Sequence, residues 1–375
     1  MEPAVASGGP ANLTREEWSA FEEALRHRRD LVYDYLNTWP GADAFRPPEI
    51  HDALFSYIAR RGKALRPLLL LLSCAAVGGD EWEAVPAAAA VEVFQTWTLV
   101  HDDIIDRDRT RRGKPTVHAQ YEERASRDLA MDHREAAHYG ITVGILAGDL
   151  QQSWCYALLS DLLDRGVEPS IVLELVRRMA TFLTPQLLEG EMLDVQFSIP
   201  GAPSPGEEAI LDMLSKKTAA LLEYAAWCGA KIGLRGGDDE DGYADALGNF
   251  ARLCGTAFQL HDDILGLTAD EALLGKPVGS DLREGKLTYL VSCALAKGDD
   301  FQRSIIRGVL GAQNTSQGFI EMAIKVIHDT GAIYDTQSLA NSYIEQGLQQ
   351  LEKLPATPQR ELLRAWALYL LARKH

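Results

Sequence analysis

The chain has 375 residues, of which 46% are hydrophobic and 24% are charged, as is usual for a globular protein. Its net charge of −17 argues against a nucleic-acid partner and against attachment to an anionic membrane through bulk charge. No segment rich in Pro, Gly or Ser divides the sequence. We therefore expect a disordered tail over residues 1–12 and a single domain over residues 13–375.

The cysteines and the apolar segments indicate where the protein works. Its five cysteines are scattered in apolar settings without a CxxC pair, which is typical of reduced thiols in a cytoplasmic protein. The first ten residues lack the pattern of a signal peptide. The longest apolar run, residues 67–77, is too short to cross a bilayer. The sequence thus predicts a cytoplasmic protein without a transmembrane segment.

Helical periodicity dominates the sequence, and strand-like alternation is scarce. The capping-box pattern at residues 14–17 predicts a helix that continues to about residue 36, and Pro67 suits the start of another helix. A long apolar helix is predicted from about residue 84, and the charged, aperiodic residues 107–138 are expected to form a loop or flap. Further helices are predicted over 140–163, 170–195, 210–229 and 245–267, with several shorter ones after 288 and a last one over 362–373. This pattern predicts an all-α, single-domain helical bundle.

A first acidic cluster, Asp102, Asp103 and Asp106, lies near the end of the long apolar helix. On a helix these three side chains fall within about 100° of one face. Three unpaired carboxylates beside apolar sequence repel one another and are costly to desolvate, unless they form a solvated helix end. The basic run at residues 111–114 favours a different interpretation, in which the carboxylates are oxygen ligands that bridge Mg²⁺ to a phosphate group.

A second acidic pair, Asp262 and Asp263, follows the apolar residues 253–260 and precedes Lys276 and Lys286. Carboxylates are hard ligands that suit Mg²⁺, and basic side chains beside such a metal suit phosphate. The two clusters together predict a diphosphate held through magnesium between two helices.

The DDxxD pattern at residues 102–106, followed by Arg111-Arg112-Gly113, resembles the first magnesium motif of the trans-isoprenyl diphosphate synthases, which form the polyprenyl synthetase family. The resemblance implies that residues 13–375 form a polyprenyl synthetase domain of the isoprenoid synthase type, with a central active-site cavity. It also implies that Asp102 and Asp106 bind metal, that Arg111 contacts an allylic diphosphate, and that Arg112 contacts isopentenyl diphosphate.

Other motifs of this family follow in its order. Residues 61–67 resemble the family's GKxLRP element, in which Gly62 allows close backbone approach. By this resemblance Lys63 and Arg66 hold the diphosphate of isopentenyl diphosphate. Gln95, seven residues before Asp102, stands where members carry His or Gln for the same ligand.

The second half of the chain carries the family's remaining motifs. Lys217 and Thr218 match its KT pair, and with Gln259 they are expected to face the allylic cation. Residues 275–282 and 285–288 match the elements that would bring Lys276 and Lys286 to the allylic diphosphate.

Two positions depart from the family pattern. Residues 190–194 resemble its GQxxD stretch but carry Glu191 in place of the usual Gln, which leaves the role of this position open. The second acidic motif has Gly266 where the fuller version has a third Asp. Because Asp262 is the principal ligand of that motif in the family, we expect the loss to be tolerated.

The resemblance implies a Mg²⁺-dependent condensation of isopentenyl diphosphate with a C5 to C15 allylic diphosphate, carried out by a homodimer. Three Mg²⁺ ions on Asp102, Asp106 and Asp262 would neutralise the leaving diphosphate. The expected catalytic residues are Asp102, Asp103, Asp106, Arg111, Lys217, Thr218, Gln259, Asp262 and Asp263.

Product length is expected to depend on Phe94 and Trp97, which lie on one face of the helix before Asp102. They form either ordinary core packing or the floor of the pocket that holds the growing chain. In the family, an aromatic residue five before the motif usually accompanies C20 or C15 products. Thr98 is small where many farnesyl diphosphate synthases carry a second aromatic residue, so geranylgeranyl diphosphate is favoured and farnesyl diphosphate follows closely.

Two alternatives remain open at this point. Terpene cyclases also use DDxxD with magnesium on an all-helical fold, but they lack a GKxLRP element and usually a second acidic pair. An inactive regulatory subunit of a hetero-oligomeric synthase would typically have lost aspartates, whereas both pairs are intact in this chain.

Overall fold

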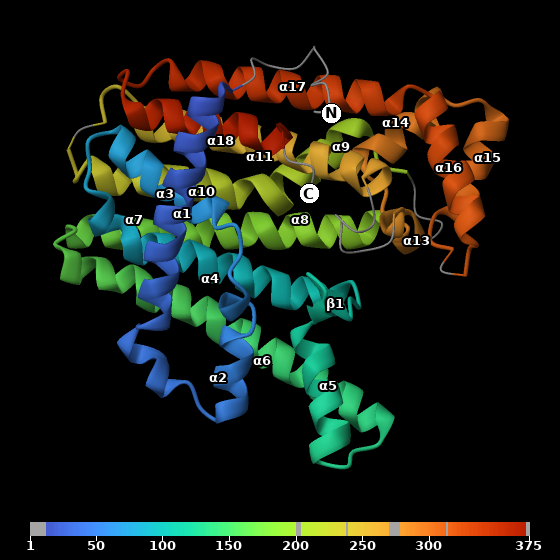
Figure 1. Ribbon diagram of the computed structural model, residues 1–375, viewed down its shortest axis with the longest axis horizontal. Coiled ribbons are helices and arrows are strands. Elements are labelled where there is room, and N and C mark those ends of the chain that lie inside the picture. Colours follow the sequence, from blue (N-terminus) through green and yellow to red (C-terminus); the bar gives the residue numbers. More distant parts are fainter. Residues whose placement is uncertain (1–12, 200–203, 238, 270–277, 313, 373–375) are drawn as a thin grey trace. The chain divides into compact units, whose positions relative to one another are not determined.

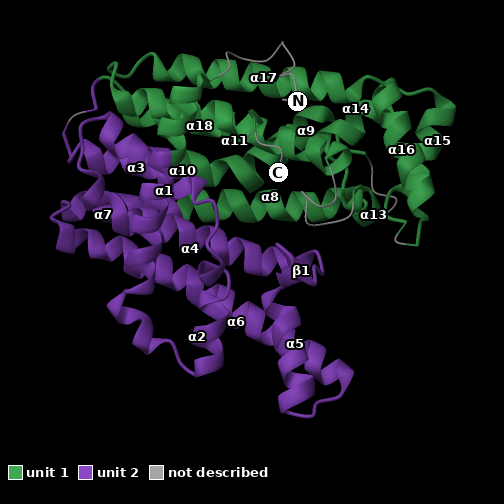
Figure 2. Cartoon of the chain, in the orientation of Figure 1, with its two compact units in different colours: residues 1–22, 181–224, 241–375 green, residues 23–180, 225–240 purple. Residues whose placement is uncertain are grey.

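The computed structural model describes residues 13–199, 204–237, 239–269, 278–312 and 314–372. The fold of this part of the chain is almost entirely helical (Figure 1), which confirms the predicted all-α class. Two compact units are interleaved along the sequence (Figure 2): unit 1 comprises Met1–Glu22, Thr181–Tyr224 and Asp241–His375, and unit 2 comprises Glu23–Ala180 and Ala225–Glu240. The expected disordered tail, residues 1–12, lies outside the described residues.

Unit 2 contains most of the first helix, the following elements through α7, and most of α10. Their bounds are α1 (Arg15–Asn37), the 3-10 helix η1 (Pro40–Ala44), α2 (Pro48–Phe55), the 3-10 helix η2 (Ile58–Arg60), α3 (Leu65–Ala76), α4 (Glu81–Ile105), β1 (Thr110–Arg111), β2 (Lys114–Pro115), α5 (Val117–Asp128), α6 (His133–Ser160), the 3-10 helix η3 (Asp161–Arg165), α7 (Pro169–Arg178) and α10 (Ala220–Gly233).

Helix α4 is the centre of unit 2 and packs against α3 and α6 (Figure 1). Every residue from Ala84 to Phe94 is buried, so this helix is apolar on all sides except at Glu92. Helix α3 contributes a fully buried run from Leu68 to Leu72, and it begins at Leu65, two residues before the start that Pro67 indicates in the sequence. The apolar packing of α4 fixes the helix whose last turn carries the first acidic motif.

The prediction of an irregular loop over residues 107–138 is wrong. This segment forms the β1–β2 hairpin, all of α5, and the start of α6. The buried residues of α5 are Val117, Tyr121 and Ala125, which are spaced by four residues, together with His118, Ala119 and Glu122. Because two of these six residues are polar or charged, the buried face produces little apolar periodicity in the sequence, although it packs against α6.

Unit 1 contains the beginning of α1, the beginning of α10, and most of the chain after residue 180. The bounds of its other elements are the π-helix η4 (Met179–Leu183), which begins in unit 2, α8 (Thr184–Phe197), α9 (Glu207–Leu214), the π-helix η5 (Ser215–Ala219), α11 (Tyr243–Thr268), α13 (Ser280–Glu284), α14 (Tyr289–Lys297), α15 (Asp300–Val309), α16 (Gln317–Asp329), α17 (Ala332–Leu351) and α18 (Pro358–Ala372).

The core of unit 1 is built on α11, which runs along α17 and also contacts α18 and η5 (Figure 1). Gly347 of α17 brings the two long helices together, because a Cβ at this position would lie 2.9 Å from Cys254 Sγ. Phe250 packs against Trp366 of α18 with ring centroids 5.7 Å apart. None of the helices in the described ranges has the length and apolar character that a membrane span needs.

Candidate active site

The first acidic motif ends helix α4. Asp102 keeps 23% of its side chain exposed, whereas Asp103 is completely buried. The Tyr57 hydroxyl donates a hydrogen bond to Asp103 Oδ2, and Arg111 Nε donates one to Asp103 Oδ1 at 2.7 Å. Burial raises the pKa of Asp103, and the Arg111 guanidinium opposes that shift. Asp103 therefore orients Arg111, whose Nη2 lies 3.5 Å from Asp102 Oδ2.

Asp106 follows as the C-cap residue of α4, and its backbone N–H donates to Asp102 O at 2.8 Å. The helical hydrogen bond between these two residues preserves their i,i+4 relation, so their carboxylates lie on one side of the helix. Both are partly exposed, and carboxylate oxygens suit Mg²⁺. The donor set at Asp102 and Asp106 thus fits the metal that the sequence predicts.

Residues 111–114 form a tight hairpin turn. Strands β1 and β2 pair antiparallel with Arg111 opposite Lys114, and the two residues between them, Arg112 and Gly113, have φ angles of 53° and 70°. Positive φ at both central positions is the requirement of a type I′ turn, which matches the twist of the flanking strands. The turn separates the two arginines. The Arg111 side chain donates a hydrogen bond to Asp103, whereas Arg112 lies at the tip of the turn.

The segment after η2 follows a strained path that a hydrogen-bond chain holds in place. Arg61 and Ala64 have φ angles of 47° and 53°, a conformation that disfavours residues with a side chain. The backbone N–H of Gly62 donates to Tyr33 Oη at 2.5 Å, and the Tyr33 hydroxyl donates to Glu92 Oε1 at 2.6 Å. Tyr33 thereby links this loop to a carboxylate inside α4.

Gly62 makes room for the cations around that carboxylate. A Cβ at this position would lie 3.3 Å from both Arg112 Nη1 and Glu92 Oε1. Burial raises the pKa of Glu92, and the positive charges of Arg66 and Arg112 oppose the shift. Three residues predicted to bind isopentenyl diphosphate, Gly62, Arg66 and Arg112, are therefore brought together around Glu92.

The other two residues predicted for this substrate lie beside the same group in the sequence. Lys63 is exposed next to Gly62, and Gln95 is partly buried on α4 three residues after Glu92. Their contacts with a substrate stay a prediction.

Phe94 and Trp97 pack edge to face on α4, with ring centroids 4.8 Å apart and an interplanar angle of 82°. Phe94 is fully buried, and Trp97 is 4% exposed. Within the described residues Trp97 Nε1 has no hydrogen-bond partner, and a buried N–H without an acceptor is costly. The Thr98 hydroxyl donates to Gln95 O at 2.9 Å. Aromatic packing therefore holds Trp97 in place.

In unit 1, Lys217 and Thr218 lie within the π-helix η5, a type of turn that is rare and often found at functional sites. Two glycines allow neighbouring helices to pack against this turn. A Cβ on Gly190 of α8 would overlap the backbone N of Lys217, and a Cβ on Gly255 of α11 would lie 2.9 Å from Ala219 Cα. The glycine of the 190–194 motif thus packs directly on the turn that carries the predicted KT pair.

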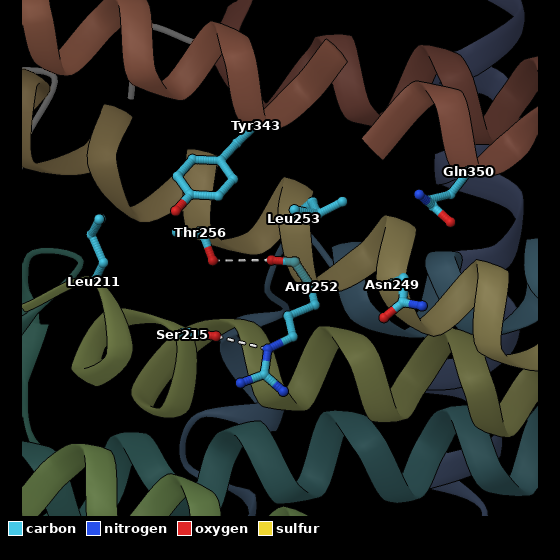
Figure 3. Close-up of a pocket in the computed structure, with 8 residues that line it drawn as sticks. All are labelled: Leu211, Ser215, Asn249, Arg252, Leu253, Thr256, Tyr343 and Gln350. Atoms are coloured by element: carbon cyan, nitrogen blue, oxygen red, sulfur yellow. Dashed lines mark hydrogen bonds between the residues drawn. The ribbon is translucent and has the colours of Figure 1, made fainter. Parts of the chain in front are cut away.

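Arg252, three residues before Gly255 on α11, also braces this turn (Figure 3). Its Nε donates to Ser215 Oγ at 2.8 Å, and its Nη1 donates to Glu223 Oε2 at 2.9 Å. Ser215 begins η5 and Glu223 follows it in α10, so one guanidinium spans the whole turn. Arg252 also lines a pocket of about 260 Å³, to which Tyr343 and Asn249 contribute polar groups.

The side chains of the KT pair are held by charged and polar partners. Lys217 Nζ lies 2.5 Å from Asp194 Oδ2 and 2.9 Å from Glu191 Oε2. The Thr218 hydroxyl donates to Gln259 Oε1 at 2.9 Å. The structure therefore brings Lys217, Thr218 and Gln259 together, and it gives Glu191 a defined contact that the sequence leaves open.

The second acidic motif repeats the arrangement of the first. Asp262 is partly exposed, whereas Asp263 is buried and accepts a hydrogen bond from Gln259 Nε2 at 3.0 Å. Burial raises the pKa of Asp263 well above its usual range. Its Oδ2 has no hydrogen-bond partner among the described residues. Adjacent residues of a helix point about 100° apart, so in each pair one carboxylate faces inward and the other is left accessible.

The missing third aspartate of this motif has a steric and electrostatic explanation. Gly266 is buried, and a Cβ there would lie 3.1 Å from Asp281 Oδ2 of α13. The negative charge of Asp281 also raises the pKa of Asp263. A carboxylate from α13 therefore stands beside the place where the fuller motif carries its own, and glycine leaves room for it.

Two lysines are predicted after the second acidic motif. Lys286 Nζ lies 3.1 Å from Glu284 Oε2, and Lys276 lies outside the described residues.

The predicted metal ligands belong to different units, Asp102 and Asp106 to unit 2 and Asp262 to unit 1. In the described part of the chain, no three Asp, Glu, His or Cys side chains are grouped so that they could hold a metal ion by themselves.

Four residues that sequence reasoning missed position the site. Glu92 and Tyr33 hold the Gly62 loop, Tyr57 holds Asp103, and Arg252 braces η5. Of these four, Glu92 could have been found from the sequence. A single acidic residue within an apolar run, here Val91 to Phe94, is a candidate for a buried carboxylate that hydrogen bonds or cations compensate.

Comparison with known proteins agrees with this geometry. The family model named Polyprenyl synthetase matches residues 47–327. A geranylgeranyl diphosphate synthase of Methanosarcina mazei is 35% identical over 330 residues, which cover 88% of this chain and 91% of that protein. The chain belongs to the polyprenyl synthetase family.

Solved structures of the family share its fold. The geranylgeranyl pyrophosphate synthetase of Pyrococcus horikoshii has a TM-score of 0.81 at 30% identity, with 96% of this chain and all of that chain covered. A geranylgeranyl pyrophosphate synthase of Corynebacterium glutamicum, complexed with isoprenyl diphosphate and magnesium, has a TM-score of 0.79 at 31% identity and covers 94% of this chain and 98% of that one. The predicted enzyme class, a trans-prenyltransferase, is confirmed, and neither a terpene cyclase nor a regulatory subunit finds support.

Restoring the family's third aspartate should harm this polyprenyl synthetase. We expect Gly266→Asp to lower the free energy of unfolding by about 1–3 kcal/mol, because it places a second carboxylate in a buried site against Asp281. Gly266→Asn occupies similar space without charge and should cost less. Denaturant unfolding of both variants checks this, and equal losses would show that space alone matters at this position.

Proposed function

We propose that the enzyme condenses isopentenyl diphosphate with an allylic diphosphate to make a short-chain trans-prenyl diphosphate. The C–O bond of the allylic diphosphate breaks, and its electron pair leaves with inorganic diphosphate. The double bond of isopentenyl diphosphate forms the new C–C bond at the allylic carbon, and a proton then leaves to restore a double bond. The released diphosphate can accept this proton, so no side-chain base is required.

The observation that carries this proposal is a group of basic side chains that is distinct from the two acidic motifs. Arg66 and Arg112 gather around Glu92 beside the glycine of the 61–67 element, and Lys63 follows on the same loop. A condensation needs one site for a diphosphate that is lost and another for a diphosphate that is kept, whereas a cyclase needs only the first. This group suits the substrate whose diphosphate is kept.

The acidic motifs suit the diphosphate that is lost. We propose that Asp102, Asp106 and Asp262 hold Mg²⁺, with three ions as the resemblance implies; bound magnesium supplies charge neutralisation to the leaving group. The complex of the Corynebacterium glutamicum relative with isoprenyl diphosphate and magnesium supports a divalent cation. Arg111, aimed by Asp103, is a further cation for the same diphosphate, as are Lys217, Lys276 and Lys286 by resemblance.

The allylic cation needs polar groups that do not attack it. Thr218 and Gln259 are joined by a hydrogen bond of 2.9 Å, and this pair is tied to Asp263 through Gln259 Nε2. This chain of hydrogen bonds holds the hydroxyl and amide dipoles in one orientation. Dipoles that are already oriented stabilise the positive charge that develops on the allylic carbon, and they need not reorient during the reaction. We propose that the backbone and side-chain oxygens of η5 and Gln259 serve this purpose.

Incubation of the purified enzyme with Mg²⁺, labelled isopentenyl diphosphate and C5, C10 or C15 allylic diphosphate tests the reaction. We expect Asp102→Ala to lower kcat by at least about 100-fold while the thermal unfolding curve is unchanged, because the variant removes a ligand and no core packing. Asp300→Ala, which removes a fully exposed aspartate, is the matched control and should keep full activity. Full activity of Asp102→Ala would contradict the metal assignment, and no incorporation by the wild type would contradict the proposed reaction.

We propose geranylgeranyl diphosphate as the main product, with farnesyl diphosphate next. The buried Phe94 and Trp97 pair supports a closed floor eight and five residues before Asp102, and the name of the Methanosarcina mazei relative agrees with a C20 product.

Shortening both aromatic side chains should therefore lengthen the product. We expect Phe94→Ala with Trp97→Ala to shift the main product by at least one C5 unit, as measured by chromatography of the dephosphorylated alcohols. Trp97→Phe retains an aromatic floor and should leave the distribution unchanged. Because large-to-small core changes cost about 3–5 kcal/mol each, Trp97→Leu is a milder second variant. Unchanged chain length in folded variants would place the floor elsewhere.

We propose that the enzyme is a homodimer. Exposed apolar residues form a stripe on α8, where Leu188, Met192 and Val195 are 51%, 55% and 39% exposed, and a second one on α6, where Ile141 and Ile145 are 38% and 44% exposed. Apolar stripes of this kind mark surfaces that another protein covers.

Light scattering should give about twice the chain mass of 41.3 kDa. Met192→Glu should shift the protein towards the monomer, because it places a charge inside the buried interface. Leu173→Glu changes an apolar residue on α7 that is 68% exposed, and it should leave the mass unchanged. A monomeric wild type would overturn the proposal.

We also propose that the enzyme works in the cytoplasm. All five cysteines are buried thiols that form no disulfide, which suits a reducing compartment.

A further inference from the structure

Glu191 of α8 contacts a residue that the proposed reaction needs for its diphosphate. Lys217 Nζ lies between Asp194 Oδ2 at 2.5 Å and Glu191 Oε2 at 2.9 Å. The three side chains are 22%, 15% and 15% exposed in the order Lys217, Asp194 and Glu191, so solvent screens their charges only in part. A Gln at position 191, as the family usually has, would leave Lys217 and Asp194 as a neutral pair.

The surroundings of this group are already negative. Asp194, Asp262 and Asp281 each act through their charge on buried Asp263, so these four acids and the Lys217 group share one region of unit 1. Lys286, another predicted diphosphate ligand, has its own carboxylate partner in Glu284 at 3.1 Å. In the described part of this region carboxylates outnumber ammonium groups. Glu191 thus adds a negative charge where the proposed reaction must bring a diphosphate.

We propose that Glu191 makes diphosphate binding at Lys217 depend on a divalent cation that is already bound. Without the cation, a diphosphate must displace a carboxylate from Lys217 and approach a negative region, which is unfavourable. With the cation bound, the same negative charge favours the metal and the repulsion is offset. The inference deepens the proposed function and rests on it, since it concerns the order in which the metal and the allylic diphosphate bind.

The chain offers a matched control two residues away. Glu189 Oε1 lies 2.8 Å from Lys216 Nζ, so the same helix and the same π-turn carry a second Glu–Lys pair. Glu189 is 52% exposed and Lys216 is a neighbour that the family motif does not use. Glu189→Gln removes the same charge from nearly the same place without changing the partners of Lys217.

Isothermal titration with inorganic diphosphate, first in EDTA and then in saturating Mg²⁺, tests the proposal. We expect Glu191→Gln to bind diphosphate about tenfold more tightly than the wild type in EDTA, and to bind Mn²⁺, followed by electron paramagnetic resonance, about tenfold more weakly. The two affinities change in opposite directions, because removing one negative charge strengthens the binding of an anion and weakens the binding of a cation. Glu189→Gln should stay within about twofold of the wild type in both titrations.

The outcomes separate this inference from the proposed function. If Glu191→Gln matches Glu189→Gln in both titrations, the inference is overturned, while turnover of isopentenyl diphosphate by the wild type would still support the reaction. If the wild type neither binds diphosphate with Mg²⁺ nor turns over substrate, the proposed function itself fails. Should Glu191→Gln fold poorly, Glu191→Ala removes the same charge and must shift both affinities in the same directions.

Discussion

The compensation of carboxylates buried inside helices is the constraint on which unit 2 depends. A carboxylate in an apolar interior is unstable unless hydrogen-bond donors or cations surround it. Asp103 is compensated by Tyr57 and Arg111, and Glu92 by Tyr33 together with two arginines. The compensating arginines are the groups that the proposed chemistry requires. Interactions that stabilise the fold of unit 2 therefore also fix the direction of its cations.

Unit 1 depends on a different constraint, which lies in its backbone. The π-turn η5 is held by two helices, by α8 at Gly190 and by α11 at Gly255 and the guanidinium of Arg252. A π-turn is less stable than the regular helix it interrupts, so it persists only where its neighbours fix it. The close approach of two helices at glycine positions supplies this fixation without any side chain that could obstruct a substrate. Rigidity at Lys217 and Thr218 is thus a property of the packing around them.

The sequence predicted the helical class, the long core helices and the order of the motifs, because apolar periodicity and the spacing of charged residues are local properties. It could not predict α5, whose buried face includes the polar residues His118 and Glu122, nor the roles of Tyr33, Tyr57 and Arg252, whose partners lie 29 to 59 residues away along the chain. Gly266 shows the limit most clearly. Its identity depends on Asp281, a residue on another helix that no local pattern connects with it.

The interleaving of the units has a consequence for synthesis on the ribosome. All segments of unit 2 are present once residue 240 has emerged, since its last segment is Ala225–Glu240. Unit 1 needs α18, because Trp366 completes the core around Phe250. Chains fold from the N-terminal side as they are made. The turn η5 and helix α9 must therefore wait with packing surface uncovered until α11 arrives, and α11 until α17 and α18 arrive, so this half of the molecule is the one that nascent-chain chaperones would need to protect.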